Sequence, residues 1–405
     1  MKLAAIIAEY NPFHNGHKYQ IDKARQLLGN DLAIVAIMSG NYTQRGDLAI
    51  ADKTFRASAA VMEGVNLVLE LPFPYSCSSA EIFATAGVHI ANSIGADYLI
   101  FGSECGEIGS LTKAANVILS EEFKNKVETI KADKKRASLS YPKLVEMAYK
   151  ELSLCSSEVD ISSPNNILAI EYIKAIKNLG ANITPITIKR IGAGYNDTTI
   201  IQNESLQSAT AIRNLISSKQ LQSASHFIPN SANIILQEAL DKGFMPSSTE
   251  KIAPAIISSL RLNTESGVKI FDADDGLYNR LCTNSMKTNS ISSLITLTET
   301  KTHTRARIKR AIINSFFGVT SSIVKELPTY TQVLAMDENG QRILKRIKRT
   351  TDFPCITKPS DYTSLSSKVI TQKEFSNKAD AVYALSLPGE VHGSYCLTFT
   401  PFVKK

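Results

Sequence analysis

Short apolar runs alternate with amphipathic segments over the first half of the chain. Runs of strand length, composed mainly of Ala, Val, Ile and Leu, lie at 3–8, 33–38, 66–71, 98–101 and 183–188. Continuous apolar runs of this length are typical of parallel strands that are buried on both faces of a sheet. Helical patterns separate them, at about 17–27, 52–63, 79–93 and 164–177. The alternation predicts an α/β fold, a Rossmann-like parallel sheet covered by helices.

The remaining segments divide the chain into two predicted parts. Residues 107–160 are charged and helix-like, which predicts a helical insertion into the first part. A polar, glycine-containing loop follows at 191–206, and 208–218 returns to a helical pattern. We place a boundary near 220, which gives a domain at 1–220 and a second at 221–405. The second part is expected to be mainly helical with short strands near 355–400, but its topology does not follow from the pattern.

Charge is distributed unevenly between these two parts. Residues 1–220 contain 22 basic and 22 acidic residues, so the net charge of +7 comes entirely from 221–405. A basic second domain is expected to bind a polyanionic partner. The six cysteines form no CxxC pair, which predicts reduced thiols and no structural zinc. The apolar runs are too short for a signal peptide or a membrane span, so we expect a cytoplasmic protein without a membrane partner.

The candidate catalytic motif is His14-Asn15-Gly16-His17, directly after the first apolar run. A strand, a sharp turn and a helix N-terminus form an anion site, because the first helical N–H groups lack intrahelical partners. This is the HxGH signature of the nucleotidyltransferase superfamily, whose members attack the α-phosphate of ATP. We interpret His14 and His17 as catalytic, against the alternative of a turn with two surface histidines.

Further phosphate or nucleotide contacts are expected at the carboxyl ends of the later strands. Gly102 and Arg190 follow the fourth and fifth runs, and Asn165 begins the helix between them. Ser208 and Thr210 open a later helix, one turn before Arg213, in a stretch similar to the superfamily's late phosphate-binding segment. A strand-end turn at Gly102, an N-cap at Asn165, a solvated charge at Arg190 and an ordinary capped helix at 208 remain alternatives.

The polar stretch 38–46 ends the second run at the same edge of the sheet. It is a candidate for binding the acceptor substrate, with Arg45 attracting an anion, or else a plain connecting loop. Asp52, Lys53 and Arg56 follow it, and we interpret them as the solvated first turn of the next helix.

Two basic runs in the second part, 301–310 and 341–349, are compatible with helices that pack one face and present the other to phosphates. We predict nucleic-acid contacts from the following residues: Arg305, Arg307, Lys309, Arg310, Lys345 and Arg346. A solvated helix face is the alternative.

Several longer strings resemble the bacterial tRNA(Met) cytidine acetate ligases. They are EYNPFHNGH (9–17), MSGNYTQRGD (38–47), NLVLELPFPYSCSSAEIFA (66–84), FGSE (101–104), SPNNILAIEY (163–172) and IKRIGAGYND (188–197). The resemblance is dense in the N-terminal half and looser toward the basic helix at 305–310. It implies that ATP activates acetate as acetyl-adenylate, with release of pyrophosphate, and that the acetyl group passes to N4 of the wobble cytidine of elongator tRNA(Met).

The resemblance also implies a set of ligand contacts. The implied ATP contacts are Ile7, Ala8, Glu9, Tyr10, Asn11, Pro12, Phe13, His14, Asn15, Gly16, His17, Lys18, Tyr19, Gln20, Gly102, Asn165 and Arg190. Mg²⁺ is expected to arrive on the ATP phosphates, with no metal site in the protein and no DNA partner. Two alternatives stay open: a small-molecule adenylyltransferase of coenzyme biosynthesis, which leaves the basic half unexplained, and a non-catalytic tRNA-binding protein.

Overall fold

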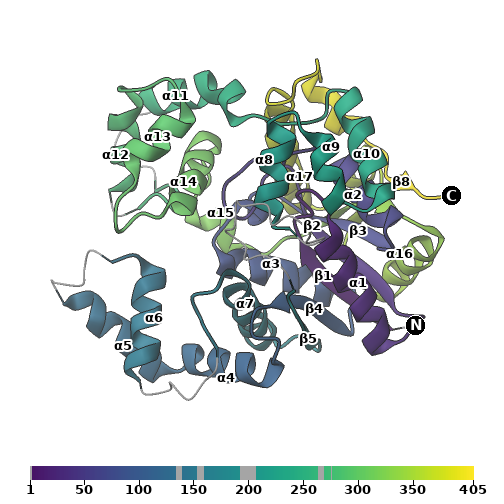
Figure 1. Ribbon diagram of the computed structural model, residues 1–405, viewed down its shortest axis with the longest axis horizontal. Helices are drawn as coiled ribbons and strands as arrows, with labels where there is room; N and C mark the ends of the chain where they lie inside the picture. The colour runs from purple at the N-terminus through teal and green to yellow at the C-terminus, as the bar shows by residue number, and fades with distance from the viewer. Residues whose placement is uncertain (1, 134–138, 153–158, 192–206, 263–268, 275) are drawn as a thin grey trace.

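The fold is organised around one eight-stranded sheet (Figure 1). The computed structural model describes residues 2–133, 139–152, 159–191, 207–262, 269–274 and 276–405. The strand order is β5-β4-β1-β2-β3-β6-β7, with β8 also paired to β6. The strands are β1 (Leu3–Ala8), β2 (Ala33–Ser39), β3 (Leu67–Leu71), β4 (Tyr98–Ser103), β5 (Thr184–Lys189), β6 (Thr331–Met336), β7 (Cys355–Ile356) and β8 (Phe402–Val403). The first five are mutually parallel, which confirms the predicted parallel α/β sheet.

The C-terminal part of the chain completes this sheet. β6 runs antiparallel to β3, and β7 and β8 each pair with β6. We predict no strand at β6 from the sequence, although all six of its residues are buried. The boundary that we place near 220 is therefore not a boundary of the sheet, because strands from both sides of it share one ladder.

Helices cover both faces of the sheet in two layers. One apolar core joins the sheet to α3, α4, α7 and α16, and the other joins it to α1, α2, α8 and α10. These helices are α1 (Asn15–Leu28), α2 (Lys53–Met62), α3 (Ala80–Ser93), α4 (Ile108–Leu119), α7 (Pro164–Asn178), α8 (Ala209–Ser217), α10 (Asn230–Asp241) and α16 (Glu338–Thr350). The N-terminal helices begin and end within about two residues of the predicted positions, as expected where the apolar period is strong.

Two groups of helices project from the same side of the molecule (Figure 1). The predicted helical insertion is confirmed, and α5 (Glu121–Ala132) and α6 (Tyr141–Glu151) form one projection. The other consists of α11 (Ala253–Leu262), α12 (Leu277–Ser285), α13 (Ile291–Thr298) and α14 (Arg305–Phe317). The short helices α9 (Leu221–Ala224) and α15 (Ser321–Lys325) and the long α17 (Ser367–Ala384) complete the chain. In the described part of the chain, no helix is both long and apolar enough to cross a bilayer.

The interpretation of Asp52, Lys53 and Arg56 as a solvated first turn is wrong, because all three side chains are buried. The Lys53 Nζ lies 2.7 Å from Glu70 of β3 and 2.6 Å from Asp380 of α17. Burial alone would lower the pKa of Lys53, but the charges of Asp380 and Glu70 outweigh it and hold the net pKa above its usual value. This ion triad joins the C-terminal helix to the N-terminal sheet.

Candidate active site

His14 and His17 are fixed against the first turn of α1. The Nδ1 atom of His14 accepts the Gly16 N–H at 3.0 Å, and Nδ1 of His17 accepts the His14 N–H at 3.2 Å. The two rings are stacked, with centroids 3.8 Å apart. A Cβ atom at position 16 would lie 2.9 Å from Cε1 of His14, so glycine lets the His14 ring fold back over the turn. This close approach explains why a glycine stands between the two histidines.

Both imidazole rings are uncharged at neutral pH, so each ring has a single N–H group that can donate a hydrogen bond. Burial, followed by the charges of Arg190 and Arg213, lowers the pKa of His14 to about 3. Burial and the neighbouring His14 and Arg190 also hold the pKa of His17 well below its usual value. A neutral ring whose Nδ1 accepts a hydrogen bond carries its proton on Nε2. Each ring is therefore a fixed Nε2–H donor at the positive end of the α1 dipole, where it suits a phosphate oxygen.

A second group of polar residues joins β4, α7 and β5. The Glu104 carboxylate accepts hydrogen bonds from the Asn165 side chain at 2.6 Å and from the Asn166 backbone N–H at 2.8 Å. The Oδ1 atom of Asn165 in turn accepts from the Arg190 guanidinium at 3.2 Å. A Cβ atom on Gly102 would lie 3.2 Å from Cγ of Arg190, so the glycine leaves room for the arginine stem. The structure thus brings the predicted Gly102, Asn165 and Arg190 together.

Glu104, which was not among the predicted site residues, is part of this group, and so is Asn166, the neighbour of Asn165 at the start of α7. The Oδ1 atom of buried Asn166 accepts the backbone N–H groups of Glu104 and Cys105 at 3.0 and 3.1 Å. These reciprocal bonds clamp the end of β4 against the start of α7. The FGSE and SPNN strings carried the signal, because each holds a polar side chain next to a predicted contact.

The N-terminus of α8 forms a third group. Ser208 is buried and its hydroxyl caps the helix by accepting the Ala211 N–H at 3.1 Å. The Arg213 guanidinium donates to the Asn11 carbonyl at 2.9 Å and to the Thr210 hydroxyl at 3.0 Å. Thr210 therefore holds Arg213, and Arg213 is the residue of this helix whose charge reaches His14.

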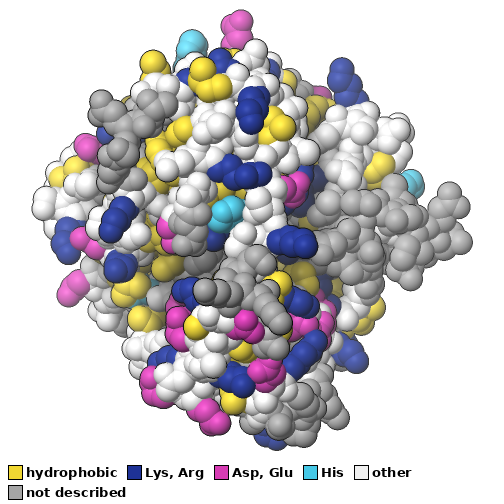
Figure 2. Space-filling view, turned by 90° about the vertical axis from the view of Figure 1, so that its left-hand side faces the viewer, with side chains coloured by type: hydrophobic (Ala, Val, Ile, Leu, Met, Phe, Trp, Pro, Cys, Tyr) yellow, Lys and Arg dark blue, Asp and Glu magenta, His cyan; other side chains and the backbone are white. Residues whose placement is uncertain are grey.

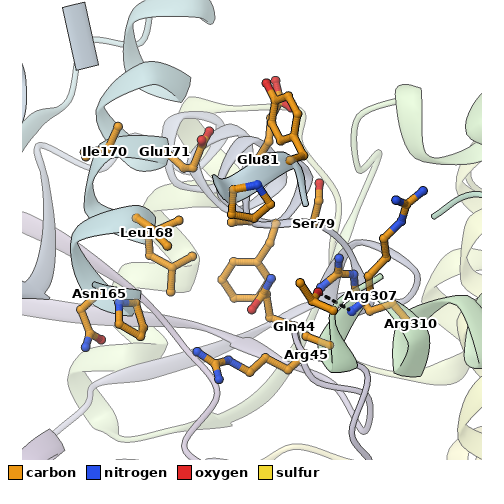
Figure 3. Close-up of a pocket in the computed structure, with 18 of the residues that line it drawn as sticks. Gln44, Arg45, Ser79, Glu81, Asn165, Leu168, Ile170, Glu171, Arg307 and Arg310 are labelled. Atoms are coloured by element: carbon orange, nitrogen blue, oxygen red, sulfur yellow. Dashed lines mark hydrogen bonds between the residues drawn. The ribbon is translucent and has the colours of Figure 1, made fainter. Parts of the chain in front are cut away.

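All three groups line one cleft with a volume of about 1990 Å³. Figure 3 shows Arg45 extending across it toward Asn165. Most of the predicted ATP contacts lie on its wall: Ile7, Ala8, Glu9, Tyr10, Asn11, His14, Gly16, His17, Tyr19, Gln20, Gly102, Asn165, Arg190 and Ser208. The lining does not include Pro12, Phe13, Asn15, Lys18 and Thr210. Phe13 is instead a core residue, and Lys18 pairs with Asp22 on the surface of α1.

The loop after β2 connects this cleft to α14. The Gln44 backbone N–H donates to Glu9 at 2.9 Å, and burial raises the pKa of the Glu9 carboxyl. Asp47 in the same loop lies 2.5 Å from the Lys309 Nζ. Gly46 has a φ of +80°, and a Cβ there would meet the Arg310 backbone at 2.4 Å. The loop is therefore packed tightly against α14.

The basic residues predicted to contact nucleic acid fall into different environments. Arg310 is buried and pairs with Asp272 at 2.5 Å, and Arg307 pairs with Asp274. Arg305, at the start of α14, is half exposed and lies 3.1 Å from Glu299. Lys309 pairs with Asp47 of the loop after β2. The remaining two, Lys345 and Arg346, are exposed on α16, which lies on the far side of the sheet from α14 (Figure 1).

The face that carries both projections is rich in charge. Figure 2 shows Lys and Arg side chains spread over this face, with Asp and Glu side chains concentrated on its lower part. Among the residues that the structure describes, no three His, Cys, Asp or Glu side chains are grouped to hold a metal ion. Of the polar loop that was predicted at 191–206, residues 192–206 lie outside the described residues.

Comparison with known proteins identifies the chain's relatives. The family model described as HIGH Nucleotidyl Transferase matches residues 1–394. A tRNA(Met) cytidine acetate ligase of Thermoanaerobacter sp. (strain X514) is 37% identical over 382 residues, which cover 92% of this chain and 93% of the relative. The enzyme of the same name from Geobacillus sp. (strain WCH70) is 33% identical over 393 residues, 96% of this chain and 95% of the relative.

Solved structures agree with the sequence comparison. The structure of Thermotoga maritima TmcAL bound with alpha-thio ATP superposes with a TM-score of 0.89 at 28% identity, covering 100% of this chain and 99% of the other. The apo form of that protein gives a TM-score of 0.91 with the same coverage and identity. The cleft, its paired histidines and these matches over nearly the whole length agree: the chain belongs to the tRNA(Met) cytidine acetate ligase family, within the HIGH nucleotidyltransferases.

Proposed function

We propose that this protein uses ATP to convert acetate to acetyl-adenylate and then transfers the acetyl group to N4 of the wobble cytidine of elongator tRNA(Met). The observation that supports the first reaction, the formation of acetyl-adenylate, is the pair of neutral histidines. Each is fixed as an Nε2–H donor in the same cleft as Arg190 and Arg213. The names of the relatives support the identity of acetate and tRNA(Met). A tRNA acceptor places the reaction in the cytoplasm.

In the first step, an acetate oxygen attacks the α-phosphorus of ATP, and the bond to the bridging oxygen of the β-phosphate breaks. Negative charge then grows on the α-phosphate oxygens and on the departing pyrophosphate. The Nε2–H groups of His14 and His17 are donors that need no reorganisation as this charge develops. Arg190 and Arg213 line the same cleft and add full positive charges. Mg²⁺ enters as part of the ATP substrate, held by phosphate oxygens.

In the second step, the N4 nitrogen of the cytidine attacks the acetyl carbon, the bond from that carbon to the AMP oxygen breaks, and AMP leaves with its electron pair. The nitrogen loses one proton to solvent as the amide forms. The mixed anhydride is reactive toward water, so the acceptor loop must fill the cleft above it. The residues that line the cleft in the described chain include no cysteine, which supports direct transfer without a thioester. Five of the six cysteines are described, all as free thiols, and Cys155 lies outside the described residues.

The test measures where labelled acetate goes when the protein is incubated with ATP, labelled acetate and total tRNA. We expect label in the acetylcytidine of tRNA(Met), and acetate-dependent exchange of label between pyrophosphate and ATP without tRNA. Label transfer that strictly required acetyl-coenzyme A would overturn the mechanism. A small-molecule adenylyltransferase would show exchange only with another acceptor, and a non-catalytic tRNA-binding protein would show no exchange.

Replacing Arg190 with alanine is expected to weaken ATP binding by about 1.5–3 kcal/mol, because a hydrogen bond from a charged donor to a phosphate is lost. Isothermal titration with ATP measures this change. The matched control is Lys177→Ala. Lys177 is exposed in the last turn of α7, at the opposite end of this helix from Asn165, so its loss should leave the ATP affinity unchanged. Equal ATP affinities of the Arg190→Ala variant and the parent protein would contradict the assignment.

We also propose phosphate contacts from α14 and α16, tested separately because the two helices lie on opposite sides of the molecule. The variant Arg305→Gln tests α14, and the double variant Lys345→Gln, Arg346→Gln tests α16. Each lost contact should reduce the log–log slope of tRNA affinity against salt by about 0.7–0.9. Buried, paired Arg310 is left intact because its loss would disturb the loop beneath α14. A helix whose variant keeps the parent slope does not contact phosphate.

A further inference from the structure

An exposed aromatic residue stands on the wall of the cleft, away from the histidines. Tyr141 is 67% exposed and is the one aromatic among the strongly exposed large hydrophobic side chains in the described part of the chain. It is the first residue of α6 and lines the cleft. Leaving such a ring in water forgoes most of the free energy that its burial would provide, so a partner that covers it gains this energy on binding.

The ring is mounted on a folded element and is not on a loose end. Pro142 follows it in the first turn of α6, where proline fixes the backbone. Leu144, Ala148 and Tyr149 on the same helix are buried in the core that includes α3 and α7. The position of the Tyr141 backbone is therefore set by packing before any partner arrives, which reduces the entropy lost on binding.

The cleft has room for a partner much larger than ATP and acetate. Its volume of about 1990 Å³ exceeds the roughly 300–1,000 Å³ typical of small-molecule sites. The same lining includes His17 of α1, Tyr141 and Lys143 of α6, and Tyr278 and Arg307 of α12 and α14. α6 and α12–α14 belong to the two separate projections (Figure 1). A partner that fills this cleft therefore contacts both the histidines and Tyr141.

We propose that Tyr141 is a stacking platform for an unpaired base of the RNA loop, next to the base that is acetylated. Unpaired loop bases are commonly recognised by stacking on aromatic rings. The chain contains no tryptophan, so tyrosine, phenylalanine or arginine must provide such stacking. The proposal rests on the proposed tRNA acceptor and extends it by naming the wall against which the loop binds.

The kinetic test compares Tyr141→Ala with Tyr141→Phe. Loss of the ring should raise the KM for tRNA about tenfold or more, whereas the phenylalanine variant should retain nearly the parent KM because stacking needs the ring and not the hydroxyl. Acetate-dependent exchange between pyrophosphate and ATP, measured without tRNA, reports whether each variant is folded. A parent-like KM for tRNA in a folded Tyr141→Ala variant overturns the proposal.

A fluorescence test uses the absence of tryptophan. Tyr141→Trp creates a single-tryptophan protein that keeps a stacking surface, and its emission should be quenched on titration with a stem–loop RNA of the anticodon arm. Leu27→Trp is the matched control, because Leu27 is 61% exposed on α1 and does not line the cleft. Its emission should not change.

The outcomes separate this proposal from the function on which it rests. Equal quenching of the Tyr141→Trp protein by ATP alone would place the ring in the nucleotide site and overturn the proposal. RNA that binds and is acetylated without any quenching would also overturn it. If the parent protein fails to acetylate tRNA at all, the proposed function fails first, and that result is visible before any variant is made.

Discussion

Replacing His17 with alanine should slow acetate-dependent exchange between pyrophosphate and ATP by on the order of 10²-fold or more. The variant loses one of two fixed Nε2–H donors at the point where charge develops on the α-phosphate. It also frees the His14 backbone N–H that His17 now accepts, which loosens the cap of α1. Tyr10 and Phe13 also lose their contacts with the His17 ring, but their contact with each other, at a centroid distance of 5.0 Å, does not depend on that ring.

The control for this prediction is His392→Ala, which removes an exposed histidine that does not line the cleft. Its exchange rate should equal that of the parent protein. Circular dichroism and a thermal melt show whether the His17→Ala protein is folded. A folded His17→Ala protein with the parent exchange rate would mean that the ring is a helix cap and takes no part in the chemistry.

The N-terminal half of the sheet could be predicted because its signals are local. Each parallel strand is a run of apolar residues that needs no partner to be visible, and each helix after it carries its own apolar stripe. The His14–His17 turn could also be predicted from the sequence, because the two rings, the glycine and the hydrogen bonds that orient the rings all lie within one helix turn. Gly102 and Arg190 followed from the rule that ligands bind at the carboxyl ends of parallel strands, and Asn165 from its place at the start of the helix between them.

The C-terminal strands and the environment of the basic residues could not be predicted, because they depend on contacts between residues far apart in the sequence. β6 joins the sheet only because β3 offers it a free edge about 260 residues earlier, and its Thr331 hydroxyl bonds the Glu70 carbonyl. Basic residues of α14 looked like a surface run, yet Arg310 and Lys309 pair with Asp272 and Asp47. A one-dimensional charge count cannot distinguish a cation that faces phosphate from one that meets a carboxylate of another segment.

Lys53, which is predicted from the sequence to be solvated but is buried in the structure, gives the prediction with the largest effect on stability. Replacing Lys53 with methionine should lower the free energy of unfolding by about 3–5 kcal/mol, because Glu70 and Asp380 would remain buried without their shared cation. Asn41 donates to Asp380 at 3.0 Å but carries no charge to compensate it. Urea unfolding at neutral pH measures the change.

Two further variants test the cause of this loss. Lys242→Met removes the cation of an exposed pair with Glu238 and should cost less than about 1 kcal/mol, because solvent screens that pair. The triple variant Lys53→Met, Glu70→Gln, Asp380→Asn leaves no buried charge in the triad and should regain much of the stability lost by the single change. If the triple variant is instead as unstable as Lys53→Met, the triad acts through its hydrogen bonds to α17, and charge burial is not the reason for the loss. A single variant as stable as the parent protein would show that α17 is held to the sheet by its apolar contacts alone.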